Sequence, residues 1–342
     1  NTFDGTIKVS KGYFLFHPGT ANAQNFADGY RPDLIIGADG KVGMNNSFRT
    51  EDNALKLGNV TGSGIFAGTY GDQNQPAFWV DVQIDQQGGA TFGGQFMYGS
   101  AARNYNVVKR GTEDWILTGD STATGVLKIE EGKVQLGDGG TTGSWAGSIT
   151  GTGQLIINRT GEVTISTDNS FSGGMVVKAG TVIAGHANAF GADANTITLA
   201  GGSVNFAGNY KQGQSLVITG GITGTASIAS GTFNGNITMD KDAVLTLASE
   251  SNTATYSLAT HISLTANTGA SLTANVELLG GTIRLGADDF TAGSSTALTI
   301  NGTLNTGTGG SATLDLSAFN GLDKATYTLL TTDTSLTQDW ID

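Results

Sequence analysis

The chain has 342 residues, with 53 glycines, three prolines, no cysteine, a net charge of −12 at pH 7, and charged residues at only 13%. This composition excludes a disordered polyelectrolyte, which needs high charge, and a coiled coil, which needs abundant Ala, Glu, Lys, Leu and Arg. It also excludes collagen, which needs a Gly-X-Y period rich in proline. The acidic balance repels nucleic acid, no apolar run reaches the roughly 18 residues of a membrane-spanning helix, and the lack of cysteine excludes disulfides, thiolate catalysis and cysteine-type zinc sites.

Residues 1–15 predict a strand, a turn and a second strand, and the same pattern returns at 121–135 and 169–183. Apolar residues alternate along each segment, which gives each strand one buried face. The second glycine of each copy is expected to supply a turn conformation that a residue with a Cβ would resist. The three segments align without gaps and share two glycine columns, namely Gly5, Gly125 and Gly173, and then Gly12, Gly132 and Gly180.

The likeness of the later copies extends upstream of the glycines, so the repeat defines modules near residues 1–16, 105–136 and 153–184. Asn1 already lies inside a module, and no apolar leader with a positively charged start precedes it. We therefore expect no targeting segment in this chain, which we interpret as a piece of a longer protein. Past each turn, the residues expected to return to the buried face are Phe14, Val134 and Val182.

Residues 17–53 form the least regular stretch, and we expect them to leave the β-structure as a loop or a small subdomain. Of the 27 aromatic residues, 15 lie before residue 106, and 11 of the 17 Lys and Arg residues lie before residue 134. Loops on a rigid scaffold concentrate recognition, and exposed aromatic rings beside polar groups often hold sugars. In the alternative interpretation, these rings fill a wide first section of the core. The candidate ligand-binding residues are Tyr30, Arg31, Trp79 and Tyr98.

Histidines and carboxylates offer little catalytic chemistry. The three histidines, His17, His186 and His261, are far apart in the sequence, so we expect no catalytic residues among them. No Asp-x-Asp-x-Asp-Gly loop occurs, and we expect neither a metal site nor a cofactor. Enzymes built on β-helices use clustered acids on a groove wall, and the acid pairs that could serve are Asp81 with Asp85, Asp240 with Asp242, and Asp288 with Asp289.

From residue 196 onward, short alternations rich in valine, isoleucine and threonine are cut by glycines, and helical periodicity is absent. A sandwich, a propeller or a solenoid could have many short strands. Here glycines recur as corners between segments that resemble one another, which favours stacked coils over hairpins. The sequence therefore predicts an all-β chain, a parallel β-helix that runs as one continuous solenoid over residues 1–342.

Residues 107–136 carry Lys109, Gly111, Trp115, Leu117, Gly119, Gly125, Ile129 and Gly132, and the next copy carries Gly161, Val163, Ile165, Asn169, Phe171, Gly173, Val177 and Gly180. At this spacing, both segments resemble the autotransporter-associated β-strand repeat, also called the passenger-associated transport repeat. The chain departs from the family pattern at Glu113, which replaces a glycine, and at Ala123, which replaces an aromatic residue. In the second copy, Ile157 and Arg159 replace the lysine and glycine with which the pattern begins.

The resemblance implies a right-handed parallel β-helix that Gram-negative bacteria export and that is secreted or displayed at the outer membrane. It names no chemistry. We expect a non-catalytic scaffold of adhesin or passenger type that presents a binding surface to host or bacterial glycans, mucus or the surface proteins of other cells. The alternative is a polysaccharide-acting β-helix enzyme, a lyase or a glycoside hydrolase. Because an open end coil exposes unpaired backbone, we also expect either end-to-end self-association or a first coil that the stretch 17–53 covers.

Overall fold

The computed structural model divides the chain into two compact units, Asn1–Met175 with Asn188–Ala192, and Val176–Ala187 with Asp193–Asp342. Each unit is described below by itself. The continuity of one solenoid over both units stays a prediction. The structure describes residues 3–16, 29–44, 48, 50–67, 78–97, 105–207, 211, 213–228, 232–233, 235–249, 252–259, 262–287, 290, 295–306, 313–319 and 328–332.

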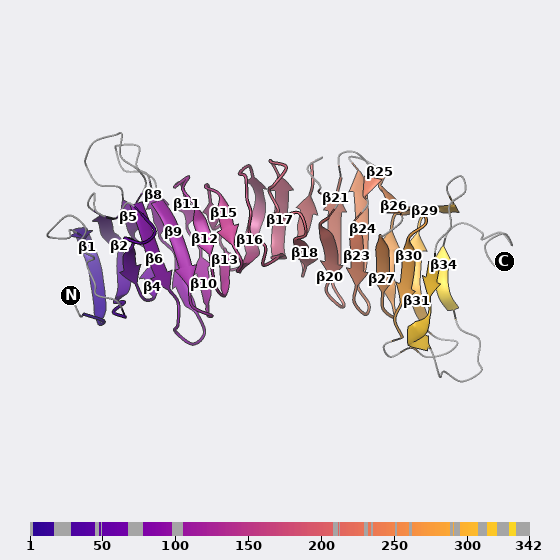
Figure 1. Cartoon of the computed structure of the whole chain (residues 1–342), viewed down its shortest axis with the longest axis horizontal. Coiled ribbons are helices and arrows are strands. Elements are labelled where there is room, and N and C mark those ends of the chain that lie inside the picture. Colours follow the sequence, from indigo (N-terminus) through magenta and orange to yellow (C-terminus); the bar gives the residue numbers. More distant parts are fainter. Residues whose placement is uncertain are drawn as a thin grey trace. The chain divides into compact units, whose positions relative to one another are not determined.

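The first unit is built from coils whose strands form three faces, and these strands are drawn in indigo to magenta in Figure 1. The first face of the coils comprises β1 (Thr6–Phe16), β2 (Asp33–Met44), β4 (Val60–Gly62), β7 (Ala90–Phe92), β10 (Asp114–Leu117), β13 (Lys133–Leu136) and β16 (Gln154–Ile165). The second face comprises the latter part of β2 with β5 (Ile65–Ala67), β8 (Gln95–Met97), β11 (Asp120–Ser121) and β14 (Ser144–Trp145). The third face comprises β3 (Leu55–Leu57), β6 (Phe78–Gln83), β9 (Tyr105–Arg110), β12 (Leu127–Ile129) and β15 (Ile149–Gly151).

Equivalent strands of successive coils pair in parallel and in register. Trp115 lies opposite Val134, and Val134 lies opposite Leu155 in the coil after that. All three side chains are completely buried. The alternation in the sequence therefore becomes a set of apolar columns that run from coil to coil, and the predicted parallel β-helix is confirmed.

The second unit repeats this arrangement, with strands drawn in rose through orange to yellow in Figure 1. Two of its faces comprise β17 (Met175–Ala184, whose first residue belongs to the first unit), β18 (Thr196–Leu199), β19 (Ser203–Asn205), β20 (Ser215–Ile218), β21 (Thr223–Ser227), β23 (Asn236–Met239), β24 (Val244–Ser249), β27 (Ser263–Ala266), β28 (Ala270–Thr273), β30 (Thr282–Leu285), β31 (Thr296–Asn301), β33 (Thr313–Asp315) and β34 (Thr328–Thr332). The third face comprises β22 (Thr232–Phe233), β26 (Thr255–Ala259), β29 (Asn275–Leu279) and β32 (Leu304–Thr306).

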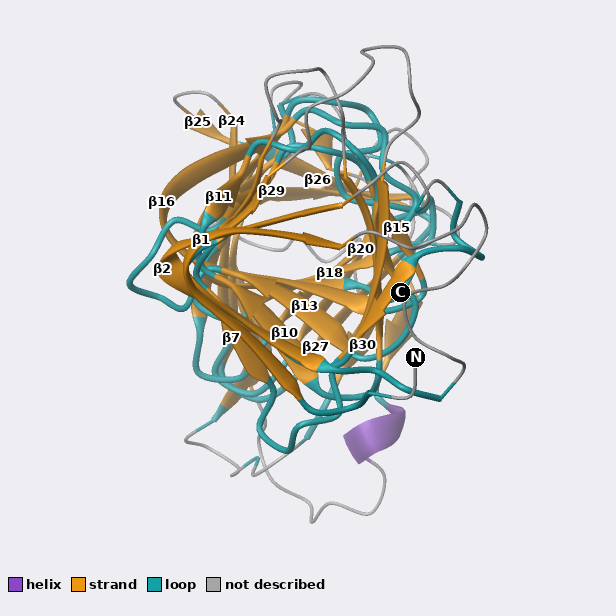
Figure 2. Ribbon diagram, turned by 90° about the vertical axis from the view of Figure 1, so that its left-hand side faces the viewer, coloured by secondary structure: helices purple, strands orange, loops and turns teal. Residues whose placement is uncertain are grey.

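Antiparallel pairing is confined, within the described residues, to β24 with the short β25 (Asn252–Thr253). The one helical turn among them is a 3-10 helix at Ser317–Phe319, drawn in purple in Figure 2. The all-β prediction is confirmed.

The glycine columns mark corners, as the repeat predicted. Gly12, Gly132 and Gly180 have φ values of 85°, 62° and 81°, in the left-handed region that side chains disfavour. Gly125 and Gly173 serve a different need, because a Cβ at either would lie within 2.1 or 2.3 Å of a carbonyl oxygen of the preceding coil. One column therefore sets the backbone conformation, and the other allows coils to approach closely.

The prediction that Phe14 is buried is wrong. Val134 and Val182 are fully buried at the equivalent position, whereas Phe14 is 39% exposed. Among the described residues β1 pairs with β2 alone, so no second coil covers its other side. Within the stretch 17–53, for which a loop or a subdomain was expected, residues 33–44 form β2 and pair with β1, while residues 17–28 lie outside the described residues.

Aromatic rings fill the interior of the first unit. The Phe66 and Phe96 rings stack with centroids 4.7 Å apart, and Phe96 also contacts Trp115 and Trp145. These contacts support the interpretation that many of the early aromatic residues widen the core. The polar atoms of buried rings all find backbone carbonyls, as Trp115 donates to Val60, Trp145 to Gly125, Tyr105 to Ala67 and Tyr256 to Gly235.

The contact between Phe96 and Trp145 crosses an intervening coil. Ser121 belongs to this intervening coil. It lies opposite Trp145 of the next coil, and its hydroxyl accepts a hydrogen bond from the backbone amide of Phe96 in the previous coil. Ser121 and Ala123 are both small and buried, so the two rings meet with centroids 5.6 Å apart. Ala123, which stands where the repeat has an aromatic residue, leaves space that the rings of Phe96 and Trp145 in the flanking coils fill.

Lys109 is a completely buried cation on the inward side of β9. Its ammonium donates to the carbonyls of Gly111, Glu113 and Glu131, at 2.6, 2.6 and 2.9 Å. Burial lowers the pKa of Lys109 to about 8, so the charged form with three protons still predominates at pH 7. The lysine of the repeat therefore ties together the turns of two successive coils.

We predict that Phe96→Ala lowers the free energy of unfolding by about 3–5 kcal/mol, since it empties a fully buried ring position at the centre of the aromatic cluster. Urea unfolding followed by circular dichroism measures the loss. Phe14→Ala is the matched control, because it removes the same ring from a partly exposed place and should cost less than half as much. Equal losses for the two variants would contradict the described core.

We predict that Lys109→Met lowers the free energy of unfolding by about 2–4 kcal/mol, because it leaves three carbonyl oxygens without their donor. The same urea titration measures it. Lys133→Met on the exposed side of β13 serves as the control and should change the free energy by less than about 0.5 kcal/mol. A Lys109→Met variant as stable as the parent would show that the ammonium does not fasten the turns.

Candidate functional site

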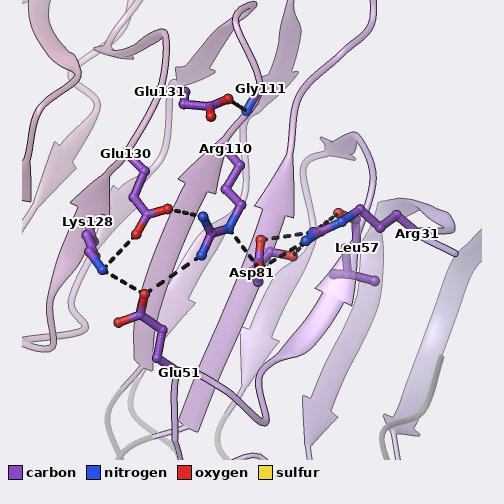
Figure 3. A network of polar contacts seen from close by, with 9 residues as sticks. All are labelled: Arg31, Glu51, Leu57, Asp81, Arg110, Gly111, Lys128, Glu130 and Glu131. Carbon is purple, nitrogen blue, oxygen red and sulfur yellow. Dashed lines mark hydrogen bonds and ion pairs between the residues drawn. The ribbon is translucent and has the colours of Figure 1, made fainter. Parts of the chain in front are cut away.

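Charged side chains gather on the outer side of the third face of the first unit (Figure 3). Alternation along β6 turns Trp79, Asp81 and Gln83 outward, while Phe78, Val80 and Val82 are buried. Parallel register places Lys56 of β3 beside Asp81, and Lys128 of β12 two strands beyond Asp81. The fold thus arranges charges in rows across neighbouring coils.

Asp81 holds two arginines in fixed positions. The Arg31 guanidinium makes a two-point contact with the Asp81 carboxylate, at 2.9 and 3.0 Å, and Arg110 donates through Nε at 3.1 Å. Arg31 comes from the segment before β2, and Arg110 ends β9. Asp81 is only 5% exposed, and such a charge is stable in a buried place because it is paired and hydrogen-bonded.

A closed ring of charges adjoins this cluster. Lys128 contacts Glu51 and Glu130 at 2.7 Å each, and Arg110 contacts the same two carboxylates, Glu51 at 3.8 Å. Burial lowers the pKa of Arg110, but the carboxylates of Asp81, Glu130 and Glu51 outweigh this and raise it. Hydrogen bonds to Glu130 and Glu51 raise the pKa of Lys128 against the smaller effect of its burial. The cations therefore stay charged at all physiological pH values.

An open depression of about 440 Å³ lies on this face. Its charges balance, so it presents many hydrogen-bonding groups without a net field. The indole of Trp79 is partly exposed, two residues before Asp81 on the same side of β6. The lining consists of three basic residues, Arg31, Lys56 and Arg110, and three acidic residues, Glu51, Asp52 and Asp81.

The four candidate binding residues do not all lie at the depression. Arg31 lines the depression, and Trp79 lies on the strand that supplies Asp81. Tyr30 precedes Arg31 and is half-buried. Tyr98 lies outside the described residues. The binding role of all four stays a prediction.

Asp81 and Asp85, the first acid pair, are both engaged by neighbouring side chains. Both Asp81 oxygens bind guanidinium groups, and Asp85 accepts a hydrogen bond from Gln83. Asp242 adopts φ 57° in a turn. Residues 288 and 289, together with His17 and His261, lie outside the described part. Within the described ranges, no three His, Cys, Asp or Glu residues are grouped so that they could hold a metal ion.

Sequence reasoning missed Glu51, Arg110, Lys128 and Glu130. Lys128 and Glu130 are two residues apart at the end of a strand, so a shared face was readable from the pattern. Glu51 gave no signal, because it lies 77 residues from its partner Lys128.

Comparison with known proteins identifies the repeat. Residues 107–136 and 150–184 match the family model described as passenger-associated-transport-repeat. The chain is 29% identical over 177 residues to the adhesin BmaC autotransporter of Brucella suis biovar 1 (strain 1330), a match that covers 48% of this chain and 5% of that protein. No solved structure matches the chain.

Across the part of the chain that the structure describes, no helix has the length and apolar character needed to cross a membrane. The two matched segments coincide with the predicted modules near 105–136 and 153–184. They contain the buried Lys109 and the corner glycines Gly132 and Gly180. The chain therefore carries the passenger-associated transport repeat in two copies within its β-helical coils.

Proposed function

We propose that this chain is part of a secreted or surface-displayed passenger of adhesin type. It binds saccharides of host or bacterial surfaces through the outer side of β3, β6, β9 and β12. The passenger-associated transport repeat and the similarity to an autotransporter adhesin support the general role. The chain spans about a twentieth of that relative's length, so the role concerns one section of such a passenger.

The observation that carries the binding proposal is the charge-balanced depression on the face where Trp79, two residues before Asp81 on the same side of β6, is partly exposed. A sugar offers apolar ring faces and a rim of hydroxyls, so it suits an aromatic ring next to fixed donors and acceptors. Asp81 holds Arg31 and Arg110 in position before any ligand arrives, which lowers the entropic cost of binding. One shallow site supports only weak affinity, and display in many copies supplies avidity.

The enzyme alternative has less support on this face. A general acid or base needs an oxygen free to exchange a proton, but two guanidinium groups engage both oxygens of Asp81. Asp81 is also nearly inaccessible to a ligand, at 5% exposure. We therefore propose binding without turnover.

We predict that the chain binds a subset of a glycan and mucin panel with dissociation constants from about 0.1 to a few millimolar. Trp79→Ala should weaken binding about five- to tenfold, since a stacking contact contributes about 1 kcal/mol, and Trp79→Phe should retain most of it. Isothermal titration or glycan-array binding measures the effect.

Thr91→Ala, on the exposed side of β7, is the control and should leave binding unchanged. A reducing-sugar release assay run on the same panel separates binding from turnover. Sugar release that disappears in Asp81→Asn or Asp85→Asn would replace the adhesin proposal with the enzyme. Binding that is equal in Trp79→Ala and the parent would move the site off this face.

We also propose end-to-end self-association of the chain through β1. Apolar side chains crowd this strand and its approach, with Phe3, Tyr13, Phe14 and Leu15 exposed by 42, 51, 39 and 41%. Among the described residues, β1 pairs along one edge only, with β2. An unpaired edge beside exposed apolar groups favours the addition of a second copy of this chain.

We predict that the chain dimerises as its concentration rises from about 1 to 100 μM and that Leu15→Lys shifts the midpoint at least tenfold upward. Analytical ultracentrifugation measures both. Leu279→Lys is the matched control, because Leu279 is 36% exposed but lies on β29, which pairs on both sides, with β26 and β32. A parent chain that is monomeric throughout this range would refute self-association through β1.

A further inference from the structure

A short segment before β3, residues 50–54, lies against the outer side of the third face, and we call it the strap. Two hydrogen bonds shape it into a turn, as the Asn53 amide donates to the Thr50 carbonyl and the Ala54 amide to the Glu51 carbonyl, each at 3.2 Å. The turn holds the Glu51 carboxylate toward Arg110 and Lys128, as Figure 3 shows.

The strap reaches a coil that lies three strands away from its own. β3 pairs with β6, β6 with β9, and β9 with β12, so Lys128 lies on the third strand away from β3. At about 4.8 Å per strand, that is about 14 Å along the stack. In a solenoid most contacts join nearest neighbours. The contact of Glu51 with Lys128 at 2.7 Å joins the first and the fourth coil of this group directly.

Burial shows that this part of the face is covered. Val108 and Asp81 both project outward from their strands, yet Val108 is 0% exposed and Asp81 is 5% exposed. Lys128, next to Val108 in the register, keeps its side chain 31% exposed. The covered positions are those spanned by Glu51 and the arginines that surround Asp81.

We propose that the strap is an ionic clamp that makes the four coils containing β3, β6, β9 and β12 open together rather than one at a time. For β3 to separate from β6, the contacts of Glu51 with Lys128 and Arg110 must break as well. The side chains of Glu51, Arg110 and Lys128 are about one-third exposed, so salt in the medium weakens the clamp. This inference is independent of any ligand.

Native-state hydrogen exchange of the whole chain, read strand by strand by mass spectrometry, tests the clamp. At about 20 mM salt, Glu51→Gln should raise exchange about three- to tenfold in β3, β6, β9 and β12 alike. At about 1 M salt, where the screening length falls to about 3 Å, the difference from the parent should become clearly smaller. Lys128→Met should act similarly, and the double variant should exchange little faster than either single variant.

Glu162→Gln is the matched control, because Glu162 is an exposed glutamate on β16, outside the network, and should leave exchange unchanged. The proposal is overturned if Glu51→Gln accelerates exchange in residues 50–57 alone. It is also overturned if the effects of Glu51→Gln and Lys128→Met simply add, or if the increase is as large at high salt as at low salt.

Discussion

In-register hydrogen bonding between parallel coils is the constraint on which the rest of this structure depends. Each strand pairs with its equivalent in the next coil, so a side chain at one position meets the side chain at that position about 4.8 Å further on. Columns of apolar residues then form the core without any long-range design. The same rule acts outside, where it collects Asp81, Arg110, Lys128 and Glu130 on one face.

The coils also need their corners held in step, and asparagine or aspartate side chains serve this purpose. Asp33 accepts the amide of Asn59, Asn106 that of Val126, Asn236 that of Ser263 and Asn275 that of Thr303. Asn169 is buried at 2% exposure and accepts from the Ile149 amide while it donates to the Ala189 carbonyl. These bonds satisfy backbone groups at turns, where the strand ladders do not reach.

The fold could be predicted from the sequence because its determinants are local and repeated. Positive φ at Gly12 and Gly132 and the alternation around them require only the segment in which they lie. The exposure of Phe14 could not be predicted from its own module, since burial there depends on what lies on the other side of the strand. Glu51 shows the same limit, because its partner depends on how many residues each intervening coil contains. Arg31 and Trp79 were candidates because basic and aromatic residues concentrate in this part of the sequence. Composition could not reveal the role of Asp81, which binds Arg31 and lies two residues after Trp79 on the same strand.

The meeting of Phe96 and Trp145 across the coil of Ser121 has a consequence for how such chains change over time. The small buried residues Ser121 and Ala123 are packed between coils whose rings reach past them. The group of coils that keeps this packing intact is therefore larger than the repeat visible in the sequence, and spans three coils. An engineer who lengthens or shortens this solenoid by a single module would separate these rings, and would do better to move Phe96, Ser121 and Trp145 together.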